Sequence, residues 1–252
     1  GYGYSANVMF NITPVEGLDI TASYTHLVSK ELTGMPGSDA SSAFTYVPTV
    51  DGPNNPILHN SQYVTPDRFF ASLTYRNKSN TFSLFYETWR GGSNYSYMYD
   101  GDFNGDGYNY DAIYIPATKD EILFVSDDDR DRFWAFLEND KYLSKHKGEY
   151  AEAYSVYSPW VHRLDLHYAH DFKVKIGKTT NTLQLSVDIK NLMNLFNSSW
   201  GVSKYMNAAL NSGRILSCDH INSEGVPVFK TSAAVSGSTP TWTYSPSIGQ
   251  CW

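Results

Sequence analysis

The sequence lacks any apolar run near the ~20 residues that a membrane-spanning helix needs. It also has little cysteine, with Cys218 and Cys251 alone. Two cysteines are too few for a disulfide scaffold or a zinc site, and a single disulfide and two free thiols both fit them. Basic residues number 19 against 26 acidic ones, for a net charge of −7. This balance argues against nucleic acid as a partner, which requires a basic surface.

Arrangements typical of enzymes are also missing. No G-x-S-x-G nucleophile elbow occurs. His167 and His170 are an odd number of residues apart on one predicted strand, so they face opposite sides and do not form a metal site with His162. Asp165 and Asp188 could face each other across a hairpin, but we interpret them as solvated charges. We therefore predict that the chain is not an enzyme.

The sequence is rich in long stretches that alternate between apolar and polar residues, the pattern of half-exposed β-strands. The clearest pair covers residues 162–195, with IGKTTN (residues 176–181) as its turn. The predicted strands are 4–12, 18–28, 68–76, 81–89, 162–175 and 182–192. The predicted long loops are 29–66, 90–161 and 197–252. Within the second loop, residues 127–139 have acidic residues first and then apolar residues at helical spacing, which predicts a short amphipathic helix.

The order of turns and loops indicates the fold class. Short turns fall at one end of the predicted strands and long loops at the other, as in outer-membrane barrels, where the short turns are periplasmic. The apolar faces of the strand centres contain no Asp, Glu, Lys or Arg, as contact with lipid requires. We predict an all-β, transmembrane antiparallel β-barrel with long extracellular loops. Six strands cannot close such a barrel. Because the chain opens on GYGYS directly before a strand and stops at Trp252, we expect it to be part of a longer protein.

An Asp/Asn-rich loop, DGDFNGDGYNYD, is the sharpest local motif. Its oxygen-bearing residues follow the spacing of a calcium-binding loop, with Gly105 at the sharp turn and Asp in place of the usual final Glu. The candidate calcium ligands are Asp100, Asp102, Asn104, Asp106 and Asp111. The alternative interpretation is a solvated turn without metal, since no helices clearly flank the loop.

Three segments resemble one protein family. NTLQLSVDIKNLMNLFNSSWG (residues 181–201) is similar to the near-C-terminal signature of SusC/RagA-type TonB-dependent outer-membrane transporters. DGDFNGDGYNYDAIYIP (residues 100–116) and residues 133–172 resemble segments of the same family, in the same order. Together they cover most of residues 90–201.

The resemblance implies the C-terminal strands of a 22-stranded barrel in the cell outer membrane, in contact with outer-membrane lipid. The family imports oligosaccharides, and sometimes peptides, with a SusD-like surface lipoprotein and with energy from TonB. The plug domain that closes the barrel, and through which TonB acts, is absent from residues 1–252. A final strand, which the family places after a Trp like Trp252, is absent too.

Two questions about ligands stay open at the level of sequence. The aromatic residues that we expect to face a sugar substrate are Tyr95, Tyr97, Tyr99 and Trp134, although interface packing also explains each of them. The alternative function is a secreted calcium-dependent carbohydrate-binding β-sandwich, which would be soluble without detergent and would pack its apolar strand faces on each other.

Overall fold

The computed structural model of this chain describes residues 1–34, 37–91 and 95–244. They form an all-β protein of mainly antiparallel sheets with few helices. Cys251 and Trp252 lie outside the described residues, and Cys218 is a free thiol. No helix in the described ranges is long and apolar enough to cross a membrane.

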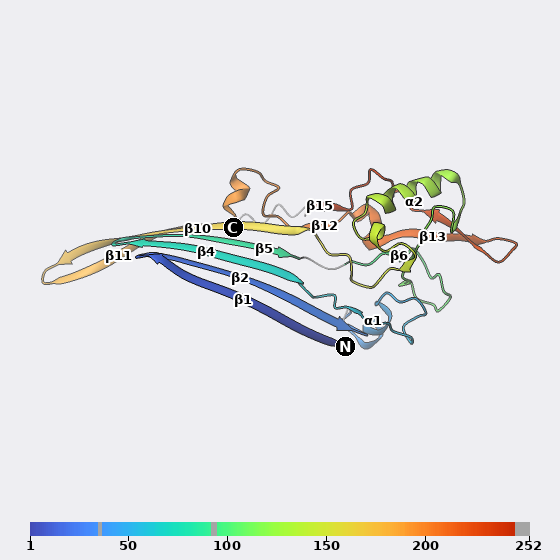
Figure 1. The fold of residues 1–252 in the computed structure, drawn as a ribbon, viewed down its shortest axis with the longest axis horizontal. Coiled ribbons are helices and arrows are strands. Elements are labelled where there is room, and N and C mark those ends of the chain that lie inside the picture. The colour runs from blue at the N-terminus through green and yellow to red at the C-terminus, as the bar shows by residue number, and fades with distance from the viewer. Residues whose placement is uncertain (35–36, 92–94, 245–252) are drawn as a thin grey trace.

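One long sheet dominates the molecule (Figure 1). Its six long strands follow each other in chain order, each antiparallel to the next, and a short seventh strand, β3, pairs with the end of β2. Strands β1 and β11 form the two edges, so the described part of the sheet is open. The strands are β1 (Tyr2–Val15), β2 (Leu18–Glu31), β3 (His59–Asn60), β4 (Asp67–Asn77), β5 (Asn80–Arg90), β10 (Trp160–Ile176) and β11 (Thr179–Ile189).

The long strands lie at the six predicted positions, and most run further than the alternation indicated. The three hairpin turns are correspondingly tighter. Only Gly177 and Lys178 separate β10 from β11, where we expected a turn of residues 176–181. Gly177 has a φ of 62° there, a left-handed conformation that glycine adopts without a steric penalty.

The strand register places most apolar residues of the six long strands on one face. One row across the sheet is entirely aliphatic, because each residue pairs with the next across the ladder. This row is Ile12, Ile20, Leu73, Leu84, Leu166 and Ile189. The face is not covered: Val8 is 71% exposed and Leu183 is 64% exposed. The long sheet therefore has no hydrophobic core of its own among the described residues.

Most of the remaining described segments, within residues 32–66, 91–159 and 197–244, form a second body that we call the loop assembly. It lies at the end of the sheet opposite the hairpin turns of β1–β2, β4–β5 and β10–β11 (Figure 1). Its helices are α1 (Ala40–Thr45), α2 (Asp127–Asn139), η1 (Leu143–Lys145) and η3 (Ala208–Gly213). Its strands are β6 (Met98–Tyr99), β7 (Tyr114–Ile115), β8 (Leu123–Phe124), β9 (Glu149–Tyr150), β12 (Lys204–Met206), β13 (Arg214–Ile221), β14 (Pro227–Thr231) and β15 (Trp242–Tyr244). The short helix η2 (Leu192–Leu195) directly follows β11 and lies beside the long sheet, against β10.

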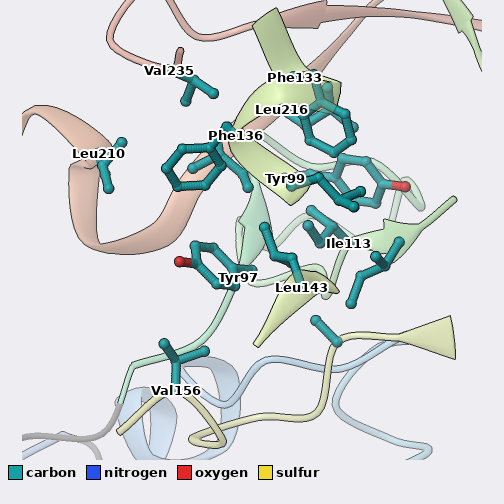
Figure 2. Close-up of a cluster of buried hydrophobic side chains, with 14 of the residues drawn as sticks. Tyr97, Tyr99, Ile113, Phe133, Phe136, Leu143, Val156, Leu210, Leu216 and Val235 are labelled. Carbon is teal, nitrogen blue, oxygen red and sulfur yellow. The ribbon is translucent and has the colours of Figure 1, made fainter. Parts of the chain in front are cut away.

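The loop assembly contains the main hydrophobic core of the described chain (Figure 2). Strands β6, β13, β14 and β8 form a small sheet, and α2 contributes Phe133, Phe136 and Leu137 to the core. Other core residues come from distant parts of the sequence, including Leu210 and Val235. The three regions of sequence without alternation of apolar and polar residues thus contribute to a compact body. The sequence did not predict this packing.

The predicted amphipathic helix is confirmed as α2. Ser126 caps its N-terminus by accepting a hydrogen bond from the Asp129 amide, at 3.1 Å. The acidic side chains of its first turn face the positive end of the helix dipole, which stabilises the helix. Packing of its apolar side against the small sheet fixes the helix on the assembly.

Replacing Phe136 by Ala is expected to destabilise the loop assembly by about 3–5 kcal/mol, because the ring is 1% exposed and its loss leaves a cavity. Phe196→Ala is the matched control, since that ring is 78% exposed and its removal is expected to change stability by about 0.5 kcal/mol or less. Limited proteolysis of the folded protein measures the difference. Equal sensitivity of the two variants would contradict this assignment of the core.

Candidate functional site

The Asp/Asn-rich loop connects β6 to β7 and is held by its own side chains. Both carboxylate oxygens of Asp102 accept backbone amide hydrogen bonds, from Gly105 at 2.7 Å and Gly107 at 2.8 Å. The Asn104 and Asp106 side chains accept from amides two residues further on, Asp106 N–H at 2.9 Å and Tyr108 N–H at 2.8 Å. The loop is therefore a series of Asx-turns.

Asp111 differs from the other carboxylates in being buried, at 3% exposed. Its Oδ2 accepts hydrogen bonds from the amides of Phe103, at 2.6 Å, and Asn104, at 3.4 Å, and so closes the loop. Burial raises the pKa of the Asp111 carboxyl above its ordinary value, more than these two amides lower it.

The four carboxylates among the five candidate calcium ligands are spread along the loop. No group of three or more His, Cys, Asp or Glu side chains within the described ranges is placed to hold one metal ion. Asp102, Asn104 and Asp106 lie in consecutive turns. Asp111 contacts this stretch by accepting hydrogen bonds from the backbone amides of Phe103 and Asn104. Asp100 is tied to β13 by its amide, which donates to the Leu216 carbonyl at 2.7 Å. Each of the Asp102 and Asn104 side-chain oxygens has a further lone pair beside its amide hydrogen bond, so the Asx-turns are compatible with a cation that draws the side chains together.

The calcium prediction is tested with Asp111→Asn, which keeps an acceptor oxygen and removes the charge. Without calcium, the ionised carboxyl costs stability because its pKa is raised, so the variant is expected to be more stable than the parent at pH 7. The two are expected to converge below about pH 4, where both side chains are neutral. With a bound cation, the parent is expected to be more stable than the variant at pH 7, since the ion stabilises the ionised carboxyl.

Thermal unfolding at pH 7 and pH 3.5, with millimolar CaCl2 or with EDTA, measures both effects. Asp120→Asn serves as the control because that side chain is 83% exposed and is not one of the five candidate ligands. An unchanged unfolding temperature of the parent in calcium would exclude calcium as a ligand of this loop.

The aromatic residues that we expected to face a substrate are mostly packed inside the loop assembly. Tyr97 is fully buried and Tyr99 is 3% exposed, so both predictions were wrong. The Tyr97 hydroxyl donates to Asp140 Oδ2 at 2.8 Å, and the Tyr99 ring stacks on Phe103 with 4.2 Å between ring centroids. Burial raises the pKa of Tyr99 to about 12 and that of Tyr97 well above its usual value. Both phenol groups therefore stay neutral, and both rings pack in the hydrophobic core.

The other two aromatic candidates are partly buried. Tyr95 packs edge-on against Trp242, with 5.5 Å between ring centroids. Trp134 carries the Lys147 ammonium 4.7 Å from its ring centroid. Both rings therefore have packing partners within the loop assembly, in line with the interface-packing explanation.

The polar face of the long sheet carries ion pairs that the sequence did not predict. Glu87 on β5 pairs with Arg68 on β4 and with Arg163 on β10, the latter at 2.9 Å. Nearer the hairpin turns, Arg76 pairs with Asp19 at 2.5 Å. A signal was present in the sequence, because charges of opposite sign fall on the polar face of neighbouring predicted strands, at Asp19 and Arg76 and at Arg68 and Glu87.

The proposed opposition of Asp165 and Asp188 was wrong. Asp188 lies directly across from His167, with 2.7 Å between Asp188 Oδ1 and the imidazole nitrogen Nδ1. Asp165 instead accepts the Asn191 amide at 2.7 Å, where the chain leaves β11. The strand register separates the two carboxylates, so they do not form an acid–base pair.

Comparison with known proteins identifies no relative. No family model, curated protein or solved structure matches this chain. The resemblance to SusC/RagA-type transporters thus remains a prediction from the quoted segments.

Proposed function

We propose that this chain forms C-terminal barrel wall and outer loops of a TonB-dependent outer-membrane importer. The importer takes up oligosaccharides or peptides and acts with a SusD-like surface lipoprotein. The observation that carries this proposal is the uncovered apolar face of the six long strands, opposite a polar face with ion pairs.

The composition of the apolar face supports contact with lipid. Its aliphatic row, from Ile12 to Ile189, is flanked on one side by Tyr75, Phe82 and Tyr168, which are direct cross-strand neighbours. Aromatic residues, with Tyr24, Phe69 and Tyr86 among them, flank it on the other side. Aliphatic bands between aromatic belts are typical of lipid-facing barrel surfaces.

The register supports a barrel wall. Tyr75 on β4 pairs with Leu18, the first residue of β2 after the β1–β2 turn. Strand β4 continues two residues further, to Asn77, before its own turn. Strand β10 continues six residues past His170, the partner of Asn80, before it turns at Ile176. Successive turns are thus staggered in one direction, as strands that tilt in a barrel must be.

The alternative, a secreted carbohydrate-binding sandwich, requires a second sheet over the apolar face. In the part of the chain that the structure describes, the other sheets belong to the loop assembly at the end of the strands. Residues along the face, such as Phe10 and Leu185, are 58% and 62% exposed. This exposure favours the barrel over the sandwich.

A charge on the apolar face is expected to impair assembly in the bilayer. Leu73→Arg places a guanidinium in the aliphatic row and is expected to cost about 2–4 kcal/mol of folding free energy in lipid. Ser72→Arg is the matched control, because the adjacent residue points to the polar face. Heat-modifiable mobility of the intact protein in outer-membrane fractions measures folding. Equal behaviour of the two variants, or recovery of the folded parent protein in aqueous solution, would refute the barrel.

Transport is tested in the host cell. Deletion of the intact protein is expected to abolish growth on at least one oligosaccharide or peptide as sole carbon source. The parent protein and the Ser72→Arg variant are expected to restore growth, and Leu73→Arg is not. Unchanged growth of the deletion strain on all oligosaccharide and peptide sources of the panel would argue against an importer.

A further inference from the structure

His59 is a buried histidine whose two ring nitrogens both point at backbone carbonyl oxygens. The residue lies in β3, where the chain returns to the end of β2 (Figure 1), and it is 3% exposed. Its Nδ1 lies 2.8 Å from the Asn60 carbonyl oxygen, and its Nε2 lies 3.2 Å from the Leu32 carbonyl oxygen. Because a carbonyl oxygen can only accept, each nitrogen must donate a proton to form its hydrogen bond.

The two acceptors determine the charge of this ring. A neutral imidazole carries one N–H group and would turn the lone pair of its other nitrogen towards a carbonyl oxygen. Two N–H groups are present only in the imidazolium form. Burial disfavours a positive charge, whereas the two carbonyl oxygens favour it, and a carboxylate nearby offsets the remaining cost.

Glu31 supplies this carboxylate. It is the direct cross-strand partner of His59 in the β2–β3 pair, so the two side chains leave the same face. The Glu31 Oε1 atom is buried and has no hydrogen-bond partner among the described residues. A buried carboxylate oxygen without a donor is costly by itself, and a neighbouring imidazolium lowers that cost. Each of the two unusual groups thus explains the other.

The other titratable groups around this pair do not replace Glu31. They are Lys30, Tyr63, Tyr110, Glu152 and Tyr154. The Tyr154 ring packs edge-on against His59, with 5.5 Å between ring centroids, and its burial and the charge of Glu31 raise the pKa of its phenol. Lys30 points to the opposite side of β2 and forms an ion pair with Glu152. Glu31 is therefore the carboxylate left to balance the imidazolium.

We propose that the His59–Glu31 pair is a pH-dependent latch that holds residues 32–66 on the end of the sheet. In the closed segment His59 keeps two ring protons, whereas a histidine in water titrates near pH ~6.5. The closed segment therefore binds one more proton than the released one above that pH. Raising the pH favours release, by up to about tenfold in the opening equilibrium constant per pH unit. The latch goes beyond the proposed import function and does not depend on it.

Opening of the latch would also loosen the Asp/Asn-rich loop. Residues 32–66 hold that loop through Thr49, whose amide donates to the Tyr110 carbonyl at 2.9 Å. The Tyr46 ring stacks on the Tyr110 ring, with 5.1 Å between ring centroids. The Tyr154 hydroxyl donates to the Tyr46 carbonyl at 3.3 Å. Tyr154 thus contacts both the latch and the segment that supports the loop.

Backbone hydrogen exchange of the purified intact protein tests the latch, with mass spectrometry of the peptide that covers residues 57–66. This peptide contains the Ser61 amide, which donates to the Ser29 carbonyl of β2 at 3.0 Å. After correction for the intrinsic pH dependence of amide exchange, the opening equilibrium constant is expected to rise about tenfold or more between about pH 6.5 and pH 8.5. A parent protein whose opening does not change over this range would overturn the proposal.

Three variants assign the pH dependence to the latch. His59→Gln keeps a donor but cannot carry a charge, so it is expected to open more readily than the parent near pH 6.5 and to lose the pH dependence. Glu31→Gln removes the counter-charge and is expected to move the opening to lower pH. His220→Gln is the matched control, because that side chain is 56% exposed on β13, and it is expected to behave as the parent does.

A pH dependence that persists in His59→Gln, or that disappears in His220→Gln, would contradict the assignment to His59. Exchange in the peptide that covers α2 is expected to stay the same in all three variants, since α2 packs in the separate core of the loop assembly. This peptide reports any general loss of folding. If His59→Gln does not fold, the pH profiles of the parent and of Glu31→Gln still decide, because an unshifted Glu31→Gln profile contradicts the pair.

Discussion

An apolar sheet face that faces water is the constraint on which the rest of this structure depends. Six antiparallel strands present a continuous apolar surface, and most of its large apolar residues on β1 and β11 remain between 42% and 71% exposed. At about 25 cal/mol per Å² of apolar area, leaving such a surface in water is costly, so a partner medium is required. The edge strands β1 and β11 also need partners, because the outer backbone N–H and C=O groups of each strand have no neighbouring strand among the described residues. In the barrel that we propose, lipid on the face and further strands at the edges would satisfy both requirements.

The loop assembly is organised by a different principle, because it removes its own apolar residues from water. Two buried carboxylates join segments that are far apart in the chain. Asp140 accepts hydrogen bonds from Tyr97 and Thr241, and Asp129 binds the Thr231 amide and Arg132. Such bonds satisfy polar groups inside the core and specify which segments meet. The Lys30–Glu152 ion pair and the Asn60–Ser155 hydrogen bond then fix the assembly to the end of the sheet.

This division explains which features the sequence could predict. Alternation with period two depends on local residues, so the six long strands were found, as was α2 with its cap and helical spacing. The core of the loop assembly could not be found in this way, because Tyr97, Leu210, Ile215 and Val235 meet through tertiary packing without any period. Tyr97 and Tyr99 illustrate the difficulty. Alternating aromatic residues look the same whether they face a ligand or a helix. Only tertiary packing distinguishes the two cases: Tyr97 packs on Phe136 of α2, and Tyr99 stacks on Phe103 and Phe229.

The residues that break the alternation are more informative than those that obey it. On a polar face, Phe70, Phe85 and Trp89 gain nothing from lipid and add apolar area to a water-facing wall. They lie beside an arginine–glutamate–arginine chain whose central carboxylate, Glu87, is 16% exposed, and Arg163 lies over the Trp89 ring. The two faces of one sheet thus differ in what holds them together, because the regular face is a continuous apolar surface and the irregular one combines aromatic rings with paired charges.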